Sequence, residues 1–125
     1  MSTHSSSRSS TLSITELQER IRAFRDERDW MQFHNHKDMA AALAIEASEL
    51  QELFLWKNSG EVEEIASTKQ ERLREELADV AVYLLELADN LGIDLSEAIL
   101  SKLAKNALKY PVEKAKGSNA KYTEL

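Results

Sequence analysis

The chain has 125 residues, a net charge of -6 at pH 7, three glycines, one proline and no cysteine. This length suits a single domain, and the few glycines and prolines favour helices over a turn-rich β fold. The lack of cysteine excludes disulfides, thiolate metal sites and cysteine nucleophiles, while the acidic charge argues against general nucleic-acid binding. No apolar run approaches the roughly 20 residues of a membrane span. We expect one all-α, cytoplasmic domain with no membrane or nucleic-acid partner.

The first predicted helix follows a serine-rich segment, residues 1–12, which we expect to be a disordered tail. Ser13 followed by Glu16 is the pattern of a capping box, in which the two residues exchange side-chain to backbone hydrogen bonds at a helix start. We expect the helix to run from here to about Trp30. Its apolar stripe consists of Ile14, Leu17, Ile21 and Phe24.

A second helix is predicted from about Asp38 to Asn58, after a polar connection at residues 34–37. Ser59 and Gly60 then supply a stop signal, and a polar loop is expected to follow them. Apolar side chains occur on almost every side of this helix, so we expect it to be central and buried.

The third helix is expected to begin at Thr68, which forms a further capping-box pattern with Glu71. It should end at Gly92, in the position that glycine favours after a helix. A fourth helix is predicted from Asp94, and it must end before Pro111.

Short connections between four helices are typical of an antiparallel bundle. We therefore predict a four-helix bundle over residues 13–110 as the functional domain, followed by a lysine-rich, irregular segment at residues 111–125. So small a bundle with so apolar a second helix is expected to form a homo-oligomer.

Two acids lie among the apolar residues of the second predicted helix. Glu46 and Glu49 are three residues apart on one helical stripe, which Leu53 and Trp56 continue. Burying a carboxylate without a partner costs several kcal/mol or forces its protonation. These acids therefore require a cation or a basic partner.

The third predicted helix repeats this spacing with Glu76 and Asp79, and Tyr83 lies one turn further on the same stripe. If the two helices pack antiparallel, four carboxylates meet. Hard divalent cations prefer such all-oxygen sites, which predicts Mg²⁺, with Mn²⁺ as the alternative. A ferritin-like di-iron site would need a histidine three residues after a glutamate on two helices, and the sequence contains no such pair.

The same acids have a simpler interpretation as a solvated, charge-paired surface, in which Arg72 and Arg74 pair with Glu75 and Glu76. For the third helix this interpretation and a binding site are equally supported. The second helix leaves little solvent-facing arc for its two acids, and the repeated spacing on both helices favours a site.

The acids and their surroundings resemble those of the MazG-like all-α nucleoside triphosphate pyrophosphohydrolases. The motif of that family, Glu-x-x-Glu, a spacer and Glu-x-x-Asp, reads here as Glu46-Ala-Ser-Glu49, 26 intervening residues and Glu76-Leu-Ala-Asp79. Three further stretches resemble the dCTP pyrophosphatase branch of the family. They are Arg-Asp-Trp-Met-Gln-Phe-His at 28–34, Glu-Leu-Gln-Glu-Leu-Phe-Leu-Trp-Lys at 49–57, and the pair Lys-Tyr-Pro at 109–111 and Lys-Tyr-Thr-Glu-Leu at 121–125.

The resemblance implies cleavage of a deoxynucleoside triphosphate, dCTP or a modified dCTP, between its α and β phosphates. The products would be the monophosphate and pyrophosphate, and the role would be nucleotide pool sanitation. The resemblance also implies a homotetramer. The residues that it assigns to Mg²⁺ and to catalysis are Glu46, Glu49, Glu76 and Asp79. Of these we expect Glu49 to be the most sensitive.

The resemblance also implies two sets of substrate contacts. Trp30, Trp56 and Tyr83 would surround the base, and Lys102, Asn106 and Tyr110 would contact the substrate from the last helix. From the residues alone, the two tryptophans suit base stacking and a core position equally well. Some relatives have a pocket histidine in the first helix where this chain has Ile21, so the preferred base stays open.

Two other functions are compatible with the sequence. A non-catalytic oligomerisation module would use the apolar second helix as its subunit interface. A related enzyme of the same superfamily would act on dUTP or on phosphoribosyl-ATP.

Overall fold

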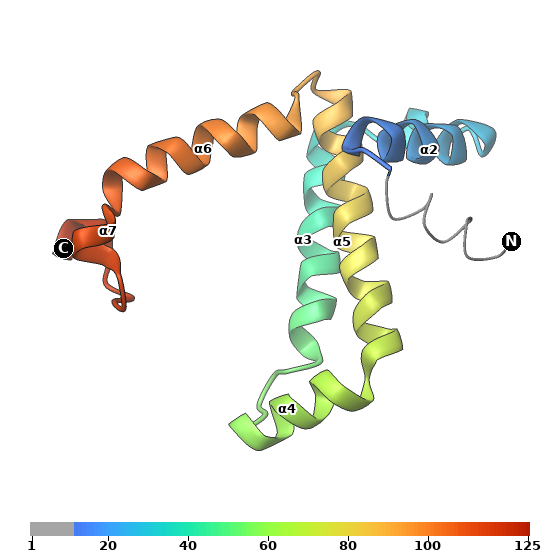
Figure 1. The fold of residues 1–125 in the computed structure, drawn as a ribbon. Coiled ribbons are helices and arrows are strands. Elements are labelled where there is room, and N and C mark those ends of the chain that lie inside the picture. The colour runs from blue at the N-terminus through green and yellow to red at the C-terminus, as the bar shows by residue number, and fades with distance from the viewer. Residues whose placement is uncertain (1–11) are drawn as a thin grey trace, which may run out of the picture. The chain divides into compact units, whose positions relative to one another are not determined.

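The computed structural model describes residues 12–125, so the tail predicted at residues 1–12 lies outside the described part except for Leu12. Within that part every regular element is helical, which confirms the all-α class. The elements are α2 (Ile14–Glu27), η1 (Met31–Phe33), α3 (His36–Glu52), α4 (Ser59–Thr68), α5 (Gln70–Asn90), α6 (Leu95–Lys109), α7 (Val112–Ala115) and η2 (Tyr122–Glu124), where η marks a 3₁₀ turn (Figure 1). The chain divides into two compact units, up to Gly92 and from Ile93 onward. The four-helix bundle stays a prediction.

Helix α2 begins with the predicted capping box. The Ser13 hydroxyl accepts a hydrogen bond from the Glu16 amide at 3.1 Å, and the Glu16 carboxylate accepts one from the Ser13 amide at 3.1 Å. The helix ends at Glu27, because Asp29 has a positive φ of 55° that a helix cannot accommodate. Trp30 therefore lies in the turn after the helix.

Helix α3 is shorter than predicted. It begins at His36, where the side chain of Asn35 caps it, and it ends at Glu52. The prediction that this helix continues to Asn58 is wrong. The chain leaves the helix in a turn, in which Trp56 has a positive φ of 63°.

The loop predicted after Gly60 is also wrong, because this segment forms helix α4. Asn58 is the N-cap of α4. Its side chain accepts a hydrogen bond from the Glu61 amide at 2.9 Å, and the Glu61 carboxylate accepts one from the Asn58 amide at 3.2 Å. Ser59 and Gly60 thus lie in the first turn of a new helix, since a complete capping box precedes them.

The start of helix α5 at Gln70 differs from the prediction, and its end agrees with it. The predicted capping box between Thr68 and Glu71 is wrong, because the Thr68 hydroxyl donates to the Glu64 carbonyl at 2.7 Å within α4. After the last turn of α5, Gly92 has a φ of 69°. Glycine adopts this left-handed conformation without steric cost, so the predicted end is confirmed.

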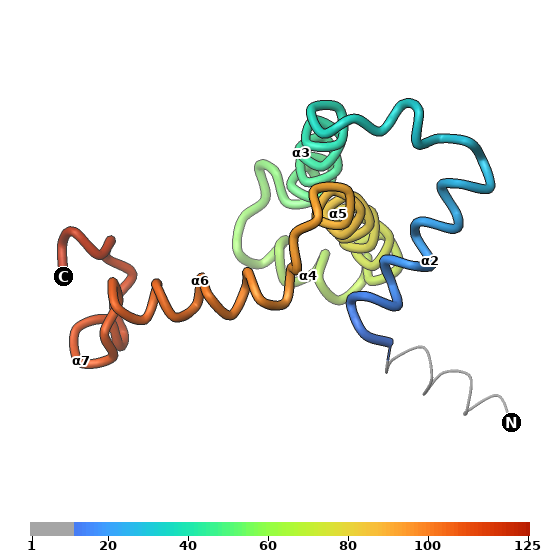
Figure 2. Tube along the Cα trace, turned by 90° about the horizontal axis from the view of Figure 1, so that it is seen from above, coloured from blue at the N-terminus to red at the C-terminus, as the bar shows by residue number. Residues whose placement is uncertain are grey.

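Helices α3 and α5 lie side by side and run in opposite directions, as the colours in Figure 1 show. Helix α2 also packs against α5, and the view from above in Figure 2 shows α2 and α3 on different sides of it. Helix α4 contacts α5 near the start of that helix. Helix α5 is therefore the centre of this unit, and α3 and α2 each form a seam with it.

The seam between α2 and α5 contains specific polar contacts. The Gln18 side chain donates to the Leu85 carbonyl at 2.9 Å. The Arg22 guanidinium forms a bidentate ion pair with Asp89, with N to O distances of 2.8 and 3.0 Å. These contacts fix α2 along the last turns of α5.

Few side chains of the described residues are fully buried. The buried apolar residues are Met39 and Ala88, and the buried polar residues are Arg25, Glu76 and Glu86. No described helix is both long enough and apolar enough to cross a membrane. The fully buried side chains of residues 12–125 thus include three charged ones and only two apolar ones.

The unit from Ile93 onward begins with the predicted fourth helix. Asp94 caps α6 by accepting a hydrogen bond from the Glu97 amide at 3.1 Å, and the helix ends at Lys109, before Pro111. Both ends therefore agree with the prediction. The segment after Pro111 contains the short helix α7, and the rings of Tyr110 and Tyr122 contact each other edge to face at 6.1 Å.

Candidate metal centre and adjoining pocket

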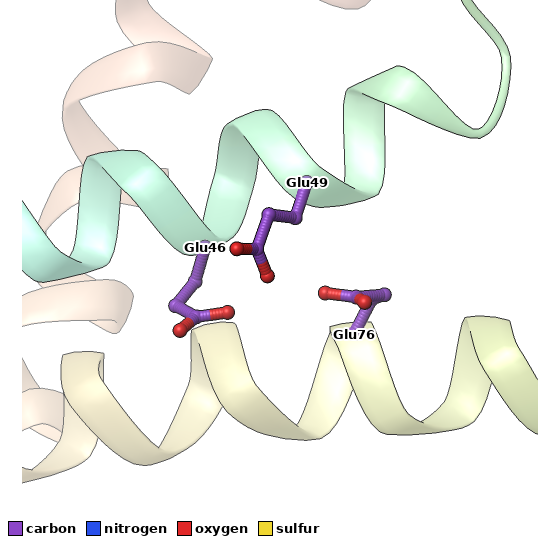
Figure 3. Close-up of side chains that lie close together, drawn as sticks. All are labelled: Glu46, Glu49 and Glu76. Atoms are coloured by element: carbon purple, nitrogen blue, oxygen red, sulfur yellow. The ribbon is translucent and has the colours of Figure 1, made fainter.

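Three of the four predicted acids meet between α3 and α5. Glu46 and Glu49 point from α3 toward α5, and Glu76 points back from α5 (Figure 3). One carboxylate oxygen from each residue lies within 4.8 Å of one from each of the others. The antiparallel packing and the spacing of three residues on α3 bring these side chains together.

Two carboxylate oxygens of this cluster lack a partner. Glu46 Oε2 and Glu76 Oε2 are buried and accept no hydrogen bond from the described residues. The other oxygen of Glu76 accepts a hydrogen bond from Arg72 Nε at 2.8 Å. Buried polar atoms are normally satisfied, so the two unpartnered oxygens are available to bind a ligand. An all-oxygen donor set with excess negative charge fits a hard divalent cation.

The electrostatics of the cluster oppose full ionisation without a cation. Removal from water raises the pKa of the Glu46 carboxyl above its ordinary value of 4.5. The adjacent Glu49 carboxyl and the negative charges of Asp79 and Glu76 raise this pKa further. A bound cation would relieve the same repulsion.

The fourth predicted acid, Asp79, lies outside the close cluster. It follows Glu76 by three residues on α5, and its side chain is exposed. Asp79 lines a neighbouring cavity of about 270 Å³ instead. Because the charge of Asp79 also acts on Glu46, Asp79 lies where the acid cluster and this cavity adjoin.

The cavity, called the aromatic pocket below, lies between α2 and α5. Its apolar lining residues are Ile21, Phe24, Trp30, Val82 and Tyr83, and its polar ones are Arg25, His34, Asp79 and Glu86. The rings of Phe24 and Trp30 contact each other edge to face, with centroids 5.8 Å apart. An aromatic, largely apolar cavity next to an acid cluster is suited to a flat ring that carries a charged chain.

The structure places two of the three predicted base contacts in this pocket, Trp30 and Tyr83. It does not place Trp56 there. Trp56 is 91% exposed and lies in the turn between α3 and α4. Its role as a base contact remains a prediction.

The predicted contacts on the last helix belong to the second unit. Lys102 is exposed, Asn106 is half-buried, and Tyr110 packs on Tyr122. Lys102 and Asn106 are one turn apart on α6, so they share one face of the helix, and Tyr110 follows as its C-cap residue. Their contact with a substrate also remains a prediction.

Sequence reasoning missed the polar end of the aromatic pocket. Glu86 is 4% exposed and accepts hydrogen bonds from His34 Nδ1 at 2.8 Å and from Asn90 Nδ2 at 3.1 Å, with Arg25 Nη1 at 3.6 Å. A signal for Glu86 exists in the sequence, because it follows Tyr83 by three residues and continues the stripe of acids on α5. Nothing local identifies Arg25 or His34, which are distant in sequence.

A second apolar groove, of about 460 Å³, lies elsewhere along α3 and α5. Its apolar lining residues include Leu50, Phe54, Leu73 and Leu77. It contains no acid cluster. This groove is suited to packing rather than to chemistry.

Several known proteins are similar to this chain in sequence or in structure. The chain is 46% identical to dCTP pyrophosphatase 1 of Homo sapiens over 104 residues, and 45% identical to that of Rattus norvegicus. Each alignment covers 82% of this chain but 61% of the relative, so the chain spans about three fifths of the length of these proteins. It is also similar to the crystal structure of a pyrophosphatase from Archaeoglobus fulgidus, with a TM-score of 0.74 and 41% sequence identity. That alignment covers 78% of this chain and 91% of the archaeal chain.

The family resemblance inferred from the acid motif is confirmed. Residues 41–125 match the MazG-like family, and the match includes both pairs of acids. Because this region makes up most of the chain, the protein belongs to the MazG-like family.

Proposed function

We propose that this protein is a divalent-cation-dependent nucleoside triphosphate pyrophosphohydrolase that acts on dCTP or a modified dCTP. The products are the monophosphate and pyrophosphate, and the role is nucleotide pool sanitation. The observation that carries the proposal is the cluster of Glu46, Glu49 and Glu76, with two buried, unpartnered oxygens beside an aromatic pocket. The similar proteins named dCTP pyrophosphatase 1 support this substrate.

The acid cluster is the part of the site that would hold the cation, Mg²⁺ or alternatively Mn²⁺. Glu46, Glu49 and Glu76 supply the ligand oxygens, and Asp79 adds negative charge beside them. When bound, the cation would offset the charge of the triphosphate and lower the pKa of an attacking water.

The protein side chains position the substrate and handle the proton. Trp30 and Tyr83 hold the base, which anchors the phosphate chain near Asp79 at the junction with the cluster. Glu49 is half-buried and lies beside the Glu46 carboxyl within the cluster. A carboxylate oxygen of the cluster that does not bind the cation can accept the proton of the attacking water, and we expect Glu49 to be the most sensitive of these acids.

We also propose that the protein works as a homo-oligomer, a tetramer by the family resemblance. Large apolar side chains are exposed in the described chain, including Phe33 at 63% and Leu108 at 85%. The groove lined by Leu50 and Phe54 is likewise open. Exposed apolar surface of this extent is typical of protein interfaces, and light scattering coupled to gel filtration measures the assembly.

Product analysis tests the proposed activity. The protein is incubated with Mg²⁺ and with each deoxynucleoside triphosphate, and with phosphoribosyl-ATP, and released pyrophosphate and phosphate are quantified separately. We expect pyrophosphate from dCTP, and its loss in Glu49→Gln. Glu63→Gln is the matched control, because Glu63 is exposed on α4 and distant from the cluster in sequence. Phosphate as the first product, or no reaction with any substrate, would refute the proposal.

A further inference from the structure

Arg72 is the only basic side chain among residues 12–125 that forms an ion pair with an acid of the cluster. Its Nε donates to Glu76 Oε1 at 2.8 Å, from one turn earlier on α5. This hydrogen bond and the charge of Glu76 raise the pKa of the Arg72 guanidinium above its ordinary value, and the charge of Glu49 on α3 adds to the effect. Arg72 therefore lies next to the cluster, at the seam between α3 and α5.

The two carboxylate oxygens of Glu76 differ in their surroundings. Oε1 accepts the hydrogen bond from Arg72, whereas Oε2 is buried and has no partner among the described residues. Oε2 can therefore bind a cation while Arg72 keeps its bond to Oε1. A phosphate that binds such a cation comes close to the guanidinium.

The Arg72 guanidinium has further N–H groups to offer. Within the described part of the chain only Nε takes part in an ion pair or hydrogen bond, and the side chain is 56% exposed. The planar fork of an arginine matches the oxygens of a phosphate, and hydrogen bonds between charged groups are the stronger ones. An exposed ion pair within one helix adds little to stability. Both Nη groups are thus available to an anionic ligand.

The order of side chains along α5 places Arg72 at the far end of the site. Residues three or four apart form one stripe of this helix, which consists of Arg72, Glu76, Asp79, Tyr83 and Glu86. Tyr83 and Glu86 line the aromatic pocket, and Asp79 adjoins it. Because an α-helix rises 1.5 Å per residue, Arg72 lies about 6 Å beyond Glu76, on the side away from the pocket. A nucleotide whose base occupies the pocket therefore directs the end of its phosphate chain toward Arg72.

We infer that Arg72 binds the terminal phosphates of the substrate and makes the site select triphosphates over nucleotides with fewer phosphates. This inference rests on the proposed function and assigns a residue that the acid motif does not include. The terminal phosphates are the part of the substrate that leaves as pyrophosphate. Of the two products, Arg72 therefore holds pyrophosphate and not the monophosphate.

Calorimetry with the two products tests this inference on the full chain without turnover. Inorganic pyrophosphate and dCMP are titrated separately at saturating Mg²⁺, so that a change in the affinity for Mg²⁺ itself does not enter. In Arg72→Gln the Kd for pyrophosphate should rise about 10-fold, the effect of losing a hydrogen bond between charged groups. The Kd for dCMP should not change, because dCMP lacks the terminal phosphates. In kinetics, the ratio of kcat/KM for dCTP to that for dCDP should fall by a similar factor.

Two further variants separate a specific contact from a general effect of charge. Arg74→Gln is the matched control, because Arg74 is an exposed arginine of the same helix that pairs with Glu71 and not with an acid of the cluster. It should keep the affinity for both products. Arg72→Lys keeps the charge but not the fork, so it should recover part of the affinity for pyrophosphate. Far-ultraviolet circular dichroism checks the fold of each variant.

Each outcome bears on a different claim. An unchanged Kd for pyrophosphate in folded Arg72→Gln would overturn the inference. An equal rise in the Kd for dCMP would also overturn it, because Arg72 would then act on the cluster as a whole. An equal loss in Arg74→Gln would overturn it by reducing the effect to net charge. In these three cases dCTP hydrolysis by the unmodified protein would leave the proposed function intact, whereas no hydrolysis of any nucleoside triphosphate would refute that function and the inference with it.

Discussion

Replacing Glu46 by glutamine should stabilise the cation-free protein and remove most of its response to Mg²⁺. Glu46 contributes a buried oxygen without a partner to a group of three carboxylates. The amide of glutamine has nearly the same shape and no charge. The substitution therefore isolates the electrostatic cost of the cluster from its packing.

The spacing of the oxygens gives the size of this effect. Two unit charges 4.8 Å apart repel each other by about 3.5 kcal/mol at an effective permittivity of about 20. Arg72 offsets part of the charge of Glu76, and the buried amide still needs hydrogen bonds. We therefore expect a net gain of about 1–3 kcal/mol in the free energy of unfolding, which corresponds to several degrees in Tm.

The assay is thermal unfolding of both proteins in EDTA and in a series of Mg²⁺ concentrations. In EDTA, Glu46→Gln should melt at the higher temperature. With Mg²⁺ at about 100 times its Kd, the unmodified protein should gain about 2.7 kcal/mol, and the variant much less because it has lost a ligand. Glu52→Gln, an exposed acid on the same helix, should behave as the unmodified protein.

Equal responses to Mg²⁺ in Glu46→Gln and the unmodified protein would refute the assignment of Glu46 as a ligand. No response in either protein would favour the non-catalytic oligomerisation module. That module would still gain stability from the substitution, because relief of repulsion does not require a cation.

The remaining predictions concern the charge around the cluster and the start of α4. Arg72→Gln removes the positive charge next to Glu76, so the Kd for Mg²⁺, measured by calorimetry, should fall about 3-fold to 10-fold. Weaker binding would show instead that Arg72 is needed to orient Glu76. The raised pKa of Glu46 means that the folded, cation-free protein holds a proton that the unfolded chain releases above pH 4.5. Its free energy of unfolding in urea should therefore fall as pH rises from there through the folded pKa, with a smaller slope in Glu46→Gln. Asn58→Ala should cost about 1 kcal/mol in thermal unfolding, because it removes the cap of α4, and no change would mean that another group caps this helix.

Local signals in the sequence predicted the ends of several helices. The capping box at Ser13, the glycine at Gly92 and the cap at Asp94 all act through bonds to residues within a few positions. Such interactions depend on the residue types and their spacing alone. Local signals predict the region between α3 and α4 wrongly. The apolar residues after Glu52 suggest that α3 continues, whereas the capping box of Asn58 with Glu61 starts a new helix there.

The acid cluster was partly predictable, because residues three apart on a helix always share a face. Which residues of two helices meet depends on how far one helix slides along the other, and no local pattern determines this. The structure accordingly brings Glu76 to the α3 acids and leaves Asp79 at the aromatic pocket. The contact of His34 with Glu86 joins positions 52 residues apart, so it appears only in the folded chain.

The seam between α2 and α5 should make the shape of the aromatic pocket depend on the ionic strength of the solution. One wall of that pocket, with Ile21 and Phe24, belongs to α2, and a half-exposed ion pair between Arg22 and Asp89 helps to hold this helix in place. The screening length of dissolved salt falls from about 8–10 Å at physiological concentrations to about 3 Å at 1 M, which is close to the length of this ion pair. Concentrated salt should therefore weaken the attachment of α2 and the wall that it gives to the pocket, while the apolar contacts of α3 with α5 stay intact.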